Sequence, residues 1–405
     1  MPQTLLTGQS ASAEAKMIRR DWIILPLICL LTVGFLACST ELVARRVFGG
    51  SKTLMANCMV LDDPLTGPRA IPNTVCWEQF PESSLVEYRF NGCGHRAGME
   101  CGPKQPGTYR IVMTGSSFAL GERVPREQTF AALLPTELSQ MTGQKVELYN
   151  ASMGWGFSHS VTLRFNEVLA AKPDVVLWVL TPTDIEGASL IVSATRDQID
   201  QQGSESLPTK AWNRMRTAFA TQSLKAAASE VFSHTRTAFM LRHFLYESHS
   251  QYLTCYLKTG DEEAGFLSAD PSAEWKGHLE QFDSDFANVE GRAQAAGIPL
   301  VVTLVPNRAE AGMISMGQWP KGYAPYKLGG ELSAIITSHG GTYIDILPDF
   351  RHVPDTDQYY LPVDGHLNAE GHIAISNLLA KGLTGGAVPA LQANSQQQAI
   401  LETGK

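Results

Sequence analysis

Three side chains in this sequence could together carry out nucleophilic catalysis. Ser117 lies directly after an apolar run, residues 109–114, and Gly115. A serine at such a strand-to-helix turn can present its hydroxyl to a substrate while its backbone N–H points toward a developing oxyanion. Asp364 and His366 stand close together near the end of the chain. Because a serine nucleophile needs a base, and the base needs an orienting carboxylate, the three residues indicate acyl-enzyme chemistry.

Each of these motifs also has a plainer interpretation. Gly115-Ser116-Ser117 could be a tight turn with a helix N-cap, and Asp364-Gly-His366 could be a metal pair or part of a helix start capped by Asn368. Two other loops favour the catalytic interpretation because they also follow predicted strands, at 150–156 and 181–184. Both could supply hydrogen-bond donors to the same oxyanion.

The elements that must position these loops alternate regularly. Apolar runs typical of buried strands lie at 109–114, 146–149, 173–180, 299–305 and 342–346, and helical spacing lies at 127–141, 159–171, 275–296 and 369–383. Continuously apolar strands that alternate with amphipathic helices predict a parallel sheet with helices on both faces. Ligands of such sheets bind at the carboxyl ends of the strands, so the chemistry is expected there.

A long, mostly helical insertion at 184–299 separates the third and fourth strands. Its segment 217–252 is predicted to form a cap beside the site, and 275–296 is the crossover helix. Aromatic positions in the cap are interpreted as packing residues, with a lipid or acyl groove as the alternative; they include Phe232, Phe239, Phe244 and Tyr246.

Four other polar residues near these loops have structural interpretations. His372 is interpreted as a capping or packing residue, and His159 as either a surface helix residue or a substrate contact. Asp184 and Glu186 form an acidic pair, which an N-capping role for the following helix explains.

The order of the four loops resembles that of the SGNH (GDSL-like) hydrolase superfamily: a Gly-Asp-Ser turn, a second-block glycine, a Gly-x-Asn-Asp block and a late Asp-x-x-His. Residues 106–121 resemble the nucleophile block, and residues 364–372 resemble the closing block of membrane-tethered bacterial members. The resemblance covers roughly 88–184 and 299–383. Together with the strand pattern it implies a flavodoxin-like three-layer α/β/α sandwich with a parallel sheet of about five strands.

Position by position, the resemblance makes Ser117 the nucleophile, His366 the base and Asp364 its orienting acid. Gly154 and Thr183, with the backbone N–H of Ser117, would form the oxyanion hole. Gly156 is the alternative to Gly154 in the oxyanion hole if the second-block loop is one residue longer than this alignment with the family assumes. The mechanism requires no metal and no organic cofactor.

The chain departs from the family pattern in three places. Ser116 stands where the family has the Asp of Gly-Asp-Ser, which should affect the turn more than the reaction. Thr183 replaces the Asn of Gly-x-Asn-Asp and can still donate one hydrogen bond, from a shorter side chain. Val363 occupies the position of the family's earlier Asp, so only Asp364 can serve as the acid.

Composition and charge exclude one class of partner and predict a membrane location. The chain has a net charge of -8, which argues against nucleic-acid binding, because that needs a basic stripe on the protein surface. Residues 22–38 carry no charge and follow three basic residues at 16–20, which favours export and a short membrane span. Three more basic residues at 45–52 follow the span, so the positive-inside rule leaves the orientation open.

The cysteines favour an oxidising compartment. Cys58, Cys76, Cys93 and Cys101 cluster after the span without the spacing of a zinc site. Two disulfides are expected, and three connectivities are possible. The alternative is four unpaired thiols. The apolar segment is interpreted first as an uncleaved membrane anchor. Lipidation at Cys38 is the second alternative, and cleavage of the segment with secretion of the protein is the third.

These observations predict a single-pass protein of the inner (plasma) membrane with an extracytoplasmic catalytic domain. The segments are a cytoplasmic tail (1–21), an anchor (22–38), a cysteine-containing segment (39–107), an SGNH hydrolase-like domain (108–386) with an insertion at about 187–272, and a tail (387–405). The expected activity is serine-dependent hydrolysis of O-acyl or O-acetyl esters on an envelope or exported glycan. Alternatives are a polysaccharide O-acetyltransferase and a catalytically decayed binding module in the same fold.

Overall fold

A five-stranded parallel sheet forms the centre of the protein. The computed structural model describes residues 21–50, 55–61, 63, 66–186, 232–233, 235–260 and 263–393. The strand order is β6-β5-β7-β8-β9, with bounds β5 Thr108–Gly115, β6 Lys145–Asn150, β7 Val175–Leu180, β8 Leu300–Leu304 and β9 Thr342–Ile344. This order is that of flavodoxin-like sheets, so the predicted fold class is confirmed.

The strands are continuous apolar runs because helices cover both faces of the sheet. Every residue of β5, β7 and β8 is buried. Met113 of β5 pairs with Asn150, the last residue of β6, and with Leu177 of β7. The loops that follow these strands therefore leave from one edge of the sheet.

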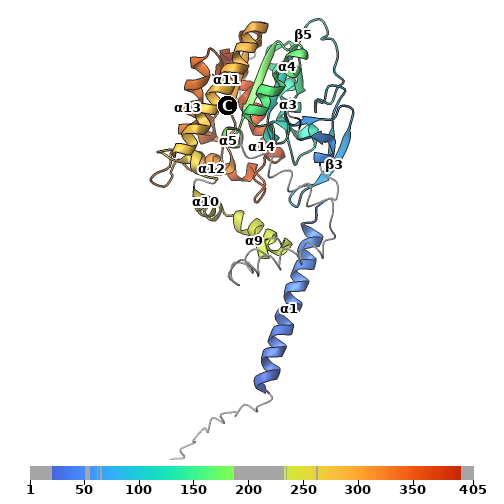
Figure 1. Ribbon diagram of the computed structural model, residues 1–405, viewed down its shortest axis with the longest axis vertical. Coiled ribbons are helices and arrows are strands. Elements are labelled where there is room, and N and C mark those ends of the chain that lie inside the picture. Colours follow the sequence, from blue (N-terminus) through green and yellow to red (C-terminus); the bar gives the residue numbers. More distant parts are fainter. Residues whose placement is uncertain are drawn as a thin grey trace, which may run out of the picture.

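Two sets of helices enclose the sheet (Figure 1). The first set is α3 (Phe130–Thr142) and α14 (Ala369–Gly382), which contact each other; the second is α4 (Ser158–Ala170), α11 (Ala273–Ala296) and α13 (Lys327–Ser338), of which α11 contacts both others. Aromatic packing joins the second set to the sheet, since Trp178 of β7 lies 5.8 Å from Phe282 and 6.1 Å from Phe286 of α11 between ring centroids.

Each strand and helix predicted for the sandwich is present, with its ends displaced by a few residues. The sequence patterns missed α13 and the shorter α12 (Arg308–Met316). The predicted cap helix at 217–252 is described only from residue 232 onward, where it is two helices, α9 (Arg236–Tyr246) and α10 (His249–Leu257). The packed part of the domain continues to Leu391, which is fully buried.

The cysteine-containing segment has a small core of its own. It contains the antiparallel hairpin of β3 (Val75–Gln79) and β4 (Leu85–Arg89) and the short pair of β1 (Met59–Val60) and β2 (Arg69–Ala70). The disulfides are Cys58–Cys76 and Cys93–Cys101. The two expected disulfides are thus present. Of the three possible connectivities, the structure has the one in which the first cysteine pairs with the second and the third with the fourth.

This segment packs against the loop that follows the nucleophile. The buried guanidinium of Arg96 donates to the carbonyl oxygens of Leu120, Gly121 and Val124. The hydroxyl of Tyr88 accepts the backbone N–H of Arg123 at 3.0 Å. The segment therefore fixes the backbone on which part of the site is built.

A single apolar helix, α1 (Asp21–Val47), projects from the domain (Figure 1). Its stretch Trp22–Val47 is long and apolar enough to cross a membrane, and none of its apolar window is buried. The uncharged run predicted as the anchor, 22–38, is thus the first part of a longer helix. Cys38 lies exposed inside that helix.

Candidate active site

The turn after β5 presents Ser117 at the carboxyl edge of the sheet. Gly115 ends β5, and Ser117 begins the short helix α2 (Ser117–Leu120). A Cβ at Gly115 would collide with the carbonyl oxygen of Val179 and with Ala119. Only glycine allows this close approach of the turn to β7, which explains the Gly that precedes the two serines.

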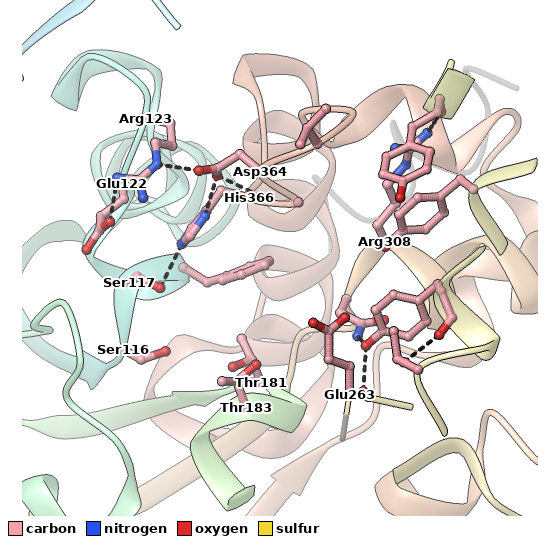
Figure 2. Close-up of a pocket in the computed structure, with 18 of the residues that line it drawn as sticks. Ser116, Ser117, Glu122, Arg123, Thr181, Thr183, Glu263, Arg308, Asp364 and His366 are labelled. Atoms are coloured by element: carbon pink, nitrogen blue, oxygen red, sulfur yellow. Dashed lines mark hydrogen bonds and ion pairs between the residues drawn. The ribbon is translucent and has the colours of Figure 1, made fainter. Parts of the chain in front are cut away.

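Ser117, His366 and Asp364 form a continuous hydrogen-bonded chain, although 249 positions separate Ser117 from His366 (Figure 2). His366 Nε2 lies 2.8 Å from Ser117 Oγ, and His366 Nδ1 lies 2.6 Å from Asp364 Oδ1. The Asp364 side chain therefore folds back onto its near neighbour in sequence. The arrangement has the connectivity of a nucleophile, a base and an orienting acid.

Arg123 neutralises the second oxygen of Asp364. Its Nε donates to Asp364 Oδ2 at 2.9 Å, and its Nη1 lies 2.7 Å from Glu122 Oε2. Burial alone would raise the pKa of Asp364, but the charges and hydrogen bonds of His366 and Arg123 outweigh it and hold that pKa well below its usual range. Asp364 is therefore ionised throughout the neutral range, as an orienting acid must be.

A second buried carboxylate, Glu78, lies at the edge of this group. Its Oε2 is 4.0 Å from Arg123 Nη1. Burial raises the pKa of Glu78 to about 7, against the attraction of Arg123 and with the repulsion of Glu122. Arg123 thus lies among three carboxylates, of which Asp364 is the one that contacts His366.

Glu82 holds the loop that carries Asp364. Its side chain is 1% exposed and accepts the backbone N–H groups of Val363 and Asp364 at 2.9–3.1 Å. The same carboxylate lies 2.6 Å from His243 Nδ1 of α9. Glu82 therefore connects the cysteine-containing segment, the cap and the acid of the triad.

The triad opens into a cavity of about 570 Å³, within the usual size range of small-ligand sites. One wall carries Ser117 and His366, and Figure 2 shows Arg308 and Glu263 across the space from them. The predicted cap forms part of the lining through Arg242 and Tyr246 of α9 and three residues of α10: Tyr252, Cys255 and Tyr256. The cap therefore contributes mainly aromatic side chains and Arg242 to the cavity wall, and the acidic Glu263 lies beside them.

The two residues proposed for the oxyanion hole differ in their access to this cavity. Thr183, in α5 (Pro182–Glu186), lines it and is exposed. Gly154 is buried and is not among the lining residues, although its neighbour Trp155 is. A Cβ at Gly154 would collide with Glu122 and Met55, and one at the alternative, Gly156, would lie 2.8 Å from the carbonyl oxygen of Met153. Close packing explains both glycines.

Asp184 has a structural partner in its own turn. Its Oδ2 accepts the backbone N–H of Thr181 at 2.6 Å and the Thr181 hydroxyl at 2.8 Å, the reciprocal half of a capping box. Burial raises the pKa of Asp184 to about 7, while hydrogen bonds from Ser116 and Thr181 act in the opposite direction. Asp184 therefore caps the start of its own helix, α5. The predicted capping of the following helix lies outside the described residues.

Two histidines near the site serve packing and surface contacts. His372 is fully buried, and its Nδ1 accepts the backbone N–H of Phe130 at 3.2 Å. Burial lowers the pKa of His372 to about 3, so it is neutral at physiological pH. His159 Nδ1 lies 3.1 Å from Asp285 Oδ1, outside the cavity lining.

The sequence patterns missed Arg123 and Glu82, which contact the triad loop, and Glu122, which pairs with Arg123. Arg123 and Glu122 follow the nucleophile closely in sequence, but a charged pair in a loop usually marks a solvated surface. Glu82 lies 282 positions from Asp364, and no local pattern links them. Within the described residues, no group of three or more His, Cys, Asp or Glu side chains could hold a metal ion.

Solved structures similar to this chain include a lipase/acylhydrolase, an esterase and a GDSL-like lipase. A lipase/acylhydrolase from Enterococcus faecalis is 15% identical, with a TM-score of 0.36, and the match covers 68% of this chain and 96% of that one. The psychrotrophic esterase EstA from Pseudoalteromonas sp. is 11% identical, with a TM-score of 0.35, over 68% of this chain and 96% of that one.

A GDSL-like lipase from Bacteroides thetaiotaomicron is 11% identical, with a TM-score of 0.32, over 70% of this chain and 91% of that one. No protein-family model matches the chain, and no curated protein matches it in sequence.

Proposed function

We propose that this protein is a serine ester hydrolase of the SGNH type that works through an acyl-enzyme on Ser117. The observation that carries the proposal is the hydrogen-bonded chain from Ser117 through His366 to Asp364. Arg123 and Glu82 support it, since one keeps Asp364 ionised and the other fixes its backbone. This connected set of contacts argues against a catalytically decayed site, because binding alone does not require a serine, a histidine and an ionised carboxylate in one hydrogen-bonded chain.

In the first half of the reaction, His366 Nε2 takes the Ser117 proton as Oγ attacks the ester carbonyl. His366 Nδ1–H donates to Asp364, which stabilises the imidazolium that forms. The tetrahedral oxyanion would be held by the backbone N–H of Ser117 and by the Thr183 hydroxyl, since both residues line the cavity. His366 then gives the proton to the departing alcohol, leaving an acyl-serine. Water attacks this ester with His366 again as the base.

The substrate we infer is an O-acyl or O-acetyl ester on an envelope or exported glycan. Two observations support a location outside the cytoplasm: the apolar helix α1 and the two disulfides. We therefore place the protein in the inner (plasma) membrane, single-pass, with the catalytic domain extracytoplasmic. Aromatic and basic cavity residues such as Trp155, Tyr256 and Arg308 provide stacking surfaces and hydrogen-bond donors for a polyhydroxylated ligand.

Hydrolysis of p-nitrophenyl acetate by the full-length protein in detergent tests the nucleophile. Ser117→Ala should abolish the enzymatic rate, whereas the adjacent Ser116→Ala should retain most of it, because Ser116 has no contact with His366. A fluorophosphonate probe should label the parent protein at Ser117 and leave Ser117→Ala unlabelled. Equal rates for parent and Ser117→Ala, or silence of the probe at high concentration, would favour the decayed binding module.

Acetyl transfer is the second candidate, because the cavity of about 570 Å³ leaves room for an acceptor sugar beside an acyl-serine. Transfer and hydrolysis share the first step and differ only in whether a sugar hydroxyl or water attacks the acyl-serine. To separate transfer from hydrolysis, the acetyl donor is incubated in water with an acceptor oligosaccharide, and the amounts of free acetate and acetylated oligosaccharide are measured. Predominant acetate supports hydrolysis, and predominant acetylated sugar supports transfer.

A further inference from the structure

Helix α9 carries an apolar stripe that no described part of the chain covers. Leu241, Phe244 and Leu245 are 52%, 58% and 41% exposed. Their spacing of i, i+3 and i+4 places them on one face of the helix. The opposite face carries Phe239, which packs on Phe48. Three large apolar side chains side by side on a single surface helix require an explanation, since isolated ones do not.

The stripe lies next to the end of the apolar helix α1. Glu41 of α1 accepts the backbone N–H groups of Arg236 and Thr237, at 3.2 and 2.9 Å, and so caps the start of α9. The ring of Phe48 lies 5.6 Å from that of Phe239 and 5.0 Å from that of His243. Figure 1 shows α9 beside the domain end of α1. The two helices are therefore joined at a defined point.

That point corresponds to the surface of a membrane that α1 would span. The uncharged run ends at Cys38, and Glu41 comes three residues later, which at 1.5 Å per residue is about 4.5 Å farther along the helix. The headgroup layers add roughly 5–8 Å on each side of a hydrocarbon core of about 30 Å. If the hydrocarbon core ends where the uncharged run ends, the start of α9 would lie at headgroup depth.

Apolar exposure continues from α1 toward α9. Leu42, Val43 and Val47, all beyond Cys38, are 69%, 58% and 64% exposed. Basic side chains flank the same region, since Arg46 of α1 and Arg242 of α9 are also exposed. An apolar face with arginines at its margin is the pattern of helices that lie in the plane of a membrane interface with anionic lipids.

We propose that α9 docks on the lipid surface of the membrane that α1 spans, with Leu241, Phe244 and Leu245 inserted among the headgroups. This inference rests on the membrane insertion of α1 in the proposed function. Docking would set the catalytic cavity against the bilayer, because Arg242 and Tyr246 of the same helix line it. His243 of α9 also contacts Glu82, which holds the backbone of Asp364. The substrate class this favours is an acyl ester presented at the membrane surface.

Photo-cross-linking tests the docking without depending on catalysis. Full-length protein in vesicles of phosphatidylcholine and phosphatidylglycerol would carry the photoreactive analogue p-benzoylphenylalanine in place of Phe244 or, separately, of Leu241. The matched control is Leu163 of α4, which is 38% exposed. Helix α4 belongs to the sheet domain and lies far from α1 (Figure 1). The positive control is Phe35 in the uncharged part of α1, which is 72% exposed.

We expect lipid adducts at positions 244 and 241 to exceed those at 163 several-fold and to approach those at 35. The docking would be overturned if position 35 forms lipid adducts but positions 241 and 244 form no more than position 163 does. That result would leave the membrane anchor intact. Adducts from α9 to a second protein molecule rather than to lipid would also overturn it. Absence of adducts at 35 would overturn the anchor, and the docking with it.

Discussion

The carboxylate of Glu82 holds the backbone of Asp364 in place: Glu82 Oε2 accepts the Asp364 N–H at 2.9 Å. The contact joins the cysteine-containing segment to the loop that carries the acid and the base of the triad. A triad needs its base within a few tenths of an ångström of the productive position. The hydrogen bonds of a buried carboxylate to two consecutive N–H groups provide such a restraint.

Glu82→Ala should lower kcat by roughly a hundredfold and leave KM nearly unchanged, because it loosens the triad without touching the substrate. Glu82→Gln keeps one acceptor oxygen and should lose only about tenfold, or about 1.4 kcal/mol. Steady-state kinetics with a soluble ester measures both. The control is Glu87→Gln in the same hairpin, whose partner is the exposed Arg89. A change in KM alone would show that Glu82 acts on binding instead.

Arg123→Gln should destabilise the protein by about 3–5 kcal/mol, since it leaves buried carboxylates without their shared cation. The pKa of Asp364 is held down in the folded protein, so its contribution to stability is present above the unfolded pKa of about 4 and is lost as the pH falls below it. In the variant this contribution shrinks, and activity should fail at a higher pH on acidification. Urea unfolding and the pH–rate profile measure the two effects, and Arg89→Gln is the exposed control.

Thr183→Val should reduce the rate on the order of tenfold or more if the Thr183 hydroxyl donates to the oxyanion. Thr183→Asn restores the residue type of the family that the sequence resembles and should leave the rate unchanged or raise it, because Asn reaches farther. Both are measured as kcat/KM on p-nitrophenyl acetate. Full activity of Thr183→Val would show that the oxyanion rests on backbone amides alone.

Asp184→Asn should remove a pH dependence of stability. The pKa of Asp184 is raised to about 7 by burial, so the stability that its protonated form provides is complete below the unfolded pKa of about 4 and is lost as the pH rises to 7. Asn can still accept both Thr181 hydrogen bonds. Chemical unfolding at pH 5 and pH 8 should therefore differ less in the variant than in the parent. An equal difference in both proteins would mean that Asp184 is already ionised at pH 5.

The sheet and its main helices could be predicted because their signals are local. Strands β5, β7 and β8 are buried on both faces, so they appear in the sequence as unbroken apolar runs. Helix α14 begins at Asn368, whose side chain accepts the N–H of Gly371, the capping pattern visible in the sequence. Helix α13 was missed, and its pair Gly329-Gly330 weakens the helical signal.

The residues around the triad show the limit of such reasoning. Ser117, Asp364 and His366 could be named because each follows a predicted strand or precedes a predicted helix in a recognisable order. Arg123 and Glu82 could not be named from the sequence, because whether a charged side chain is buried depends on which distant parts of the chain cover it. A charge in a loop is unremarkable in sequence until its partner, here Asp364, is brought close by the fold.

By itself, the sequence determined the α/β class, a parallel sheet of about five strands and an apolar N-terminal segment, and it singled out Ser117, Asp364 and His366 as candidates for the serine, acid and base of the proposed site. These follow from periodicity and from motifs of a few consecutive residues. Only the tertiary structure decided which cysteines pair, which charges surround Asp364, and that α9 joins the end of α1 through Glu41. These contacts join residues far apart in the chain, and their energy depends on burial and distance, which exist only once the chain has folded.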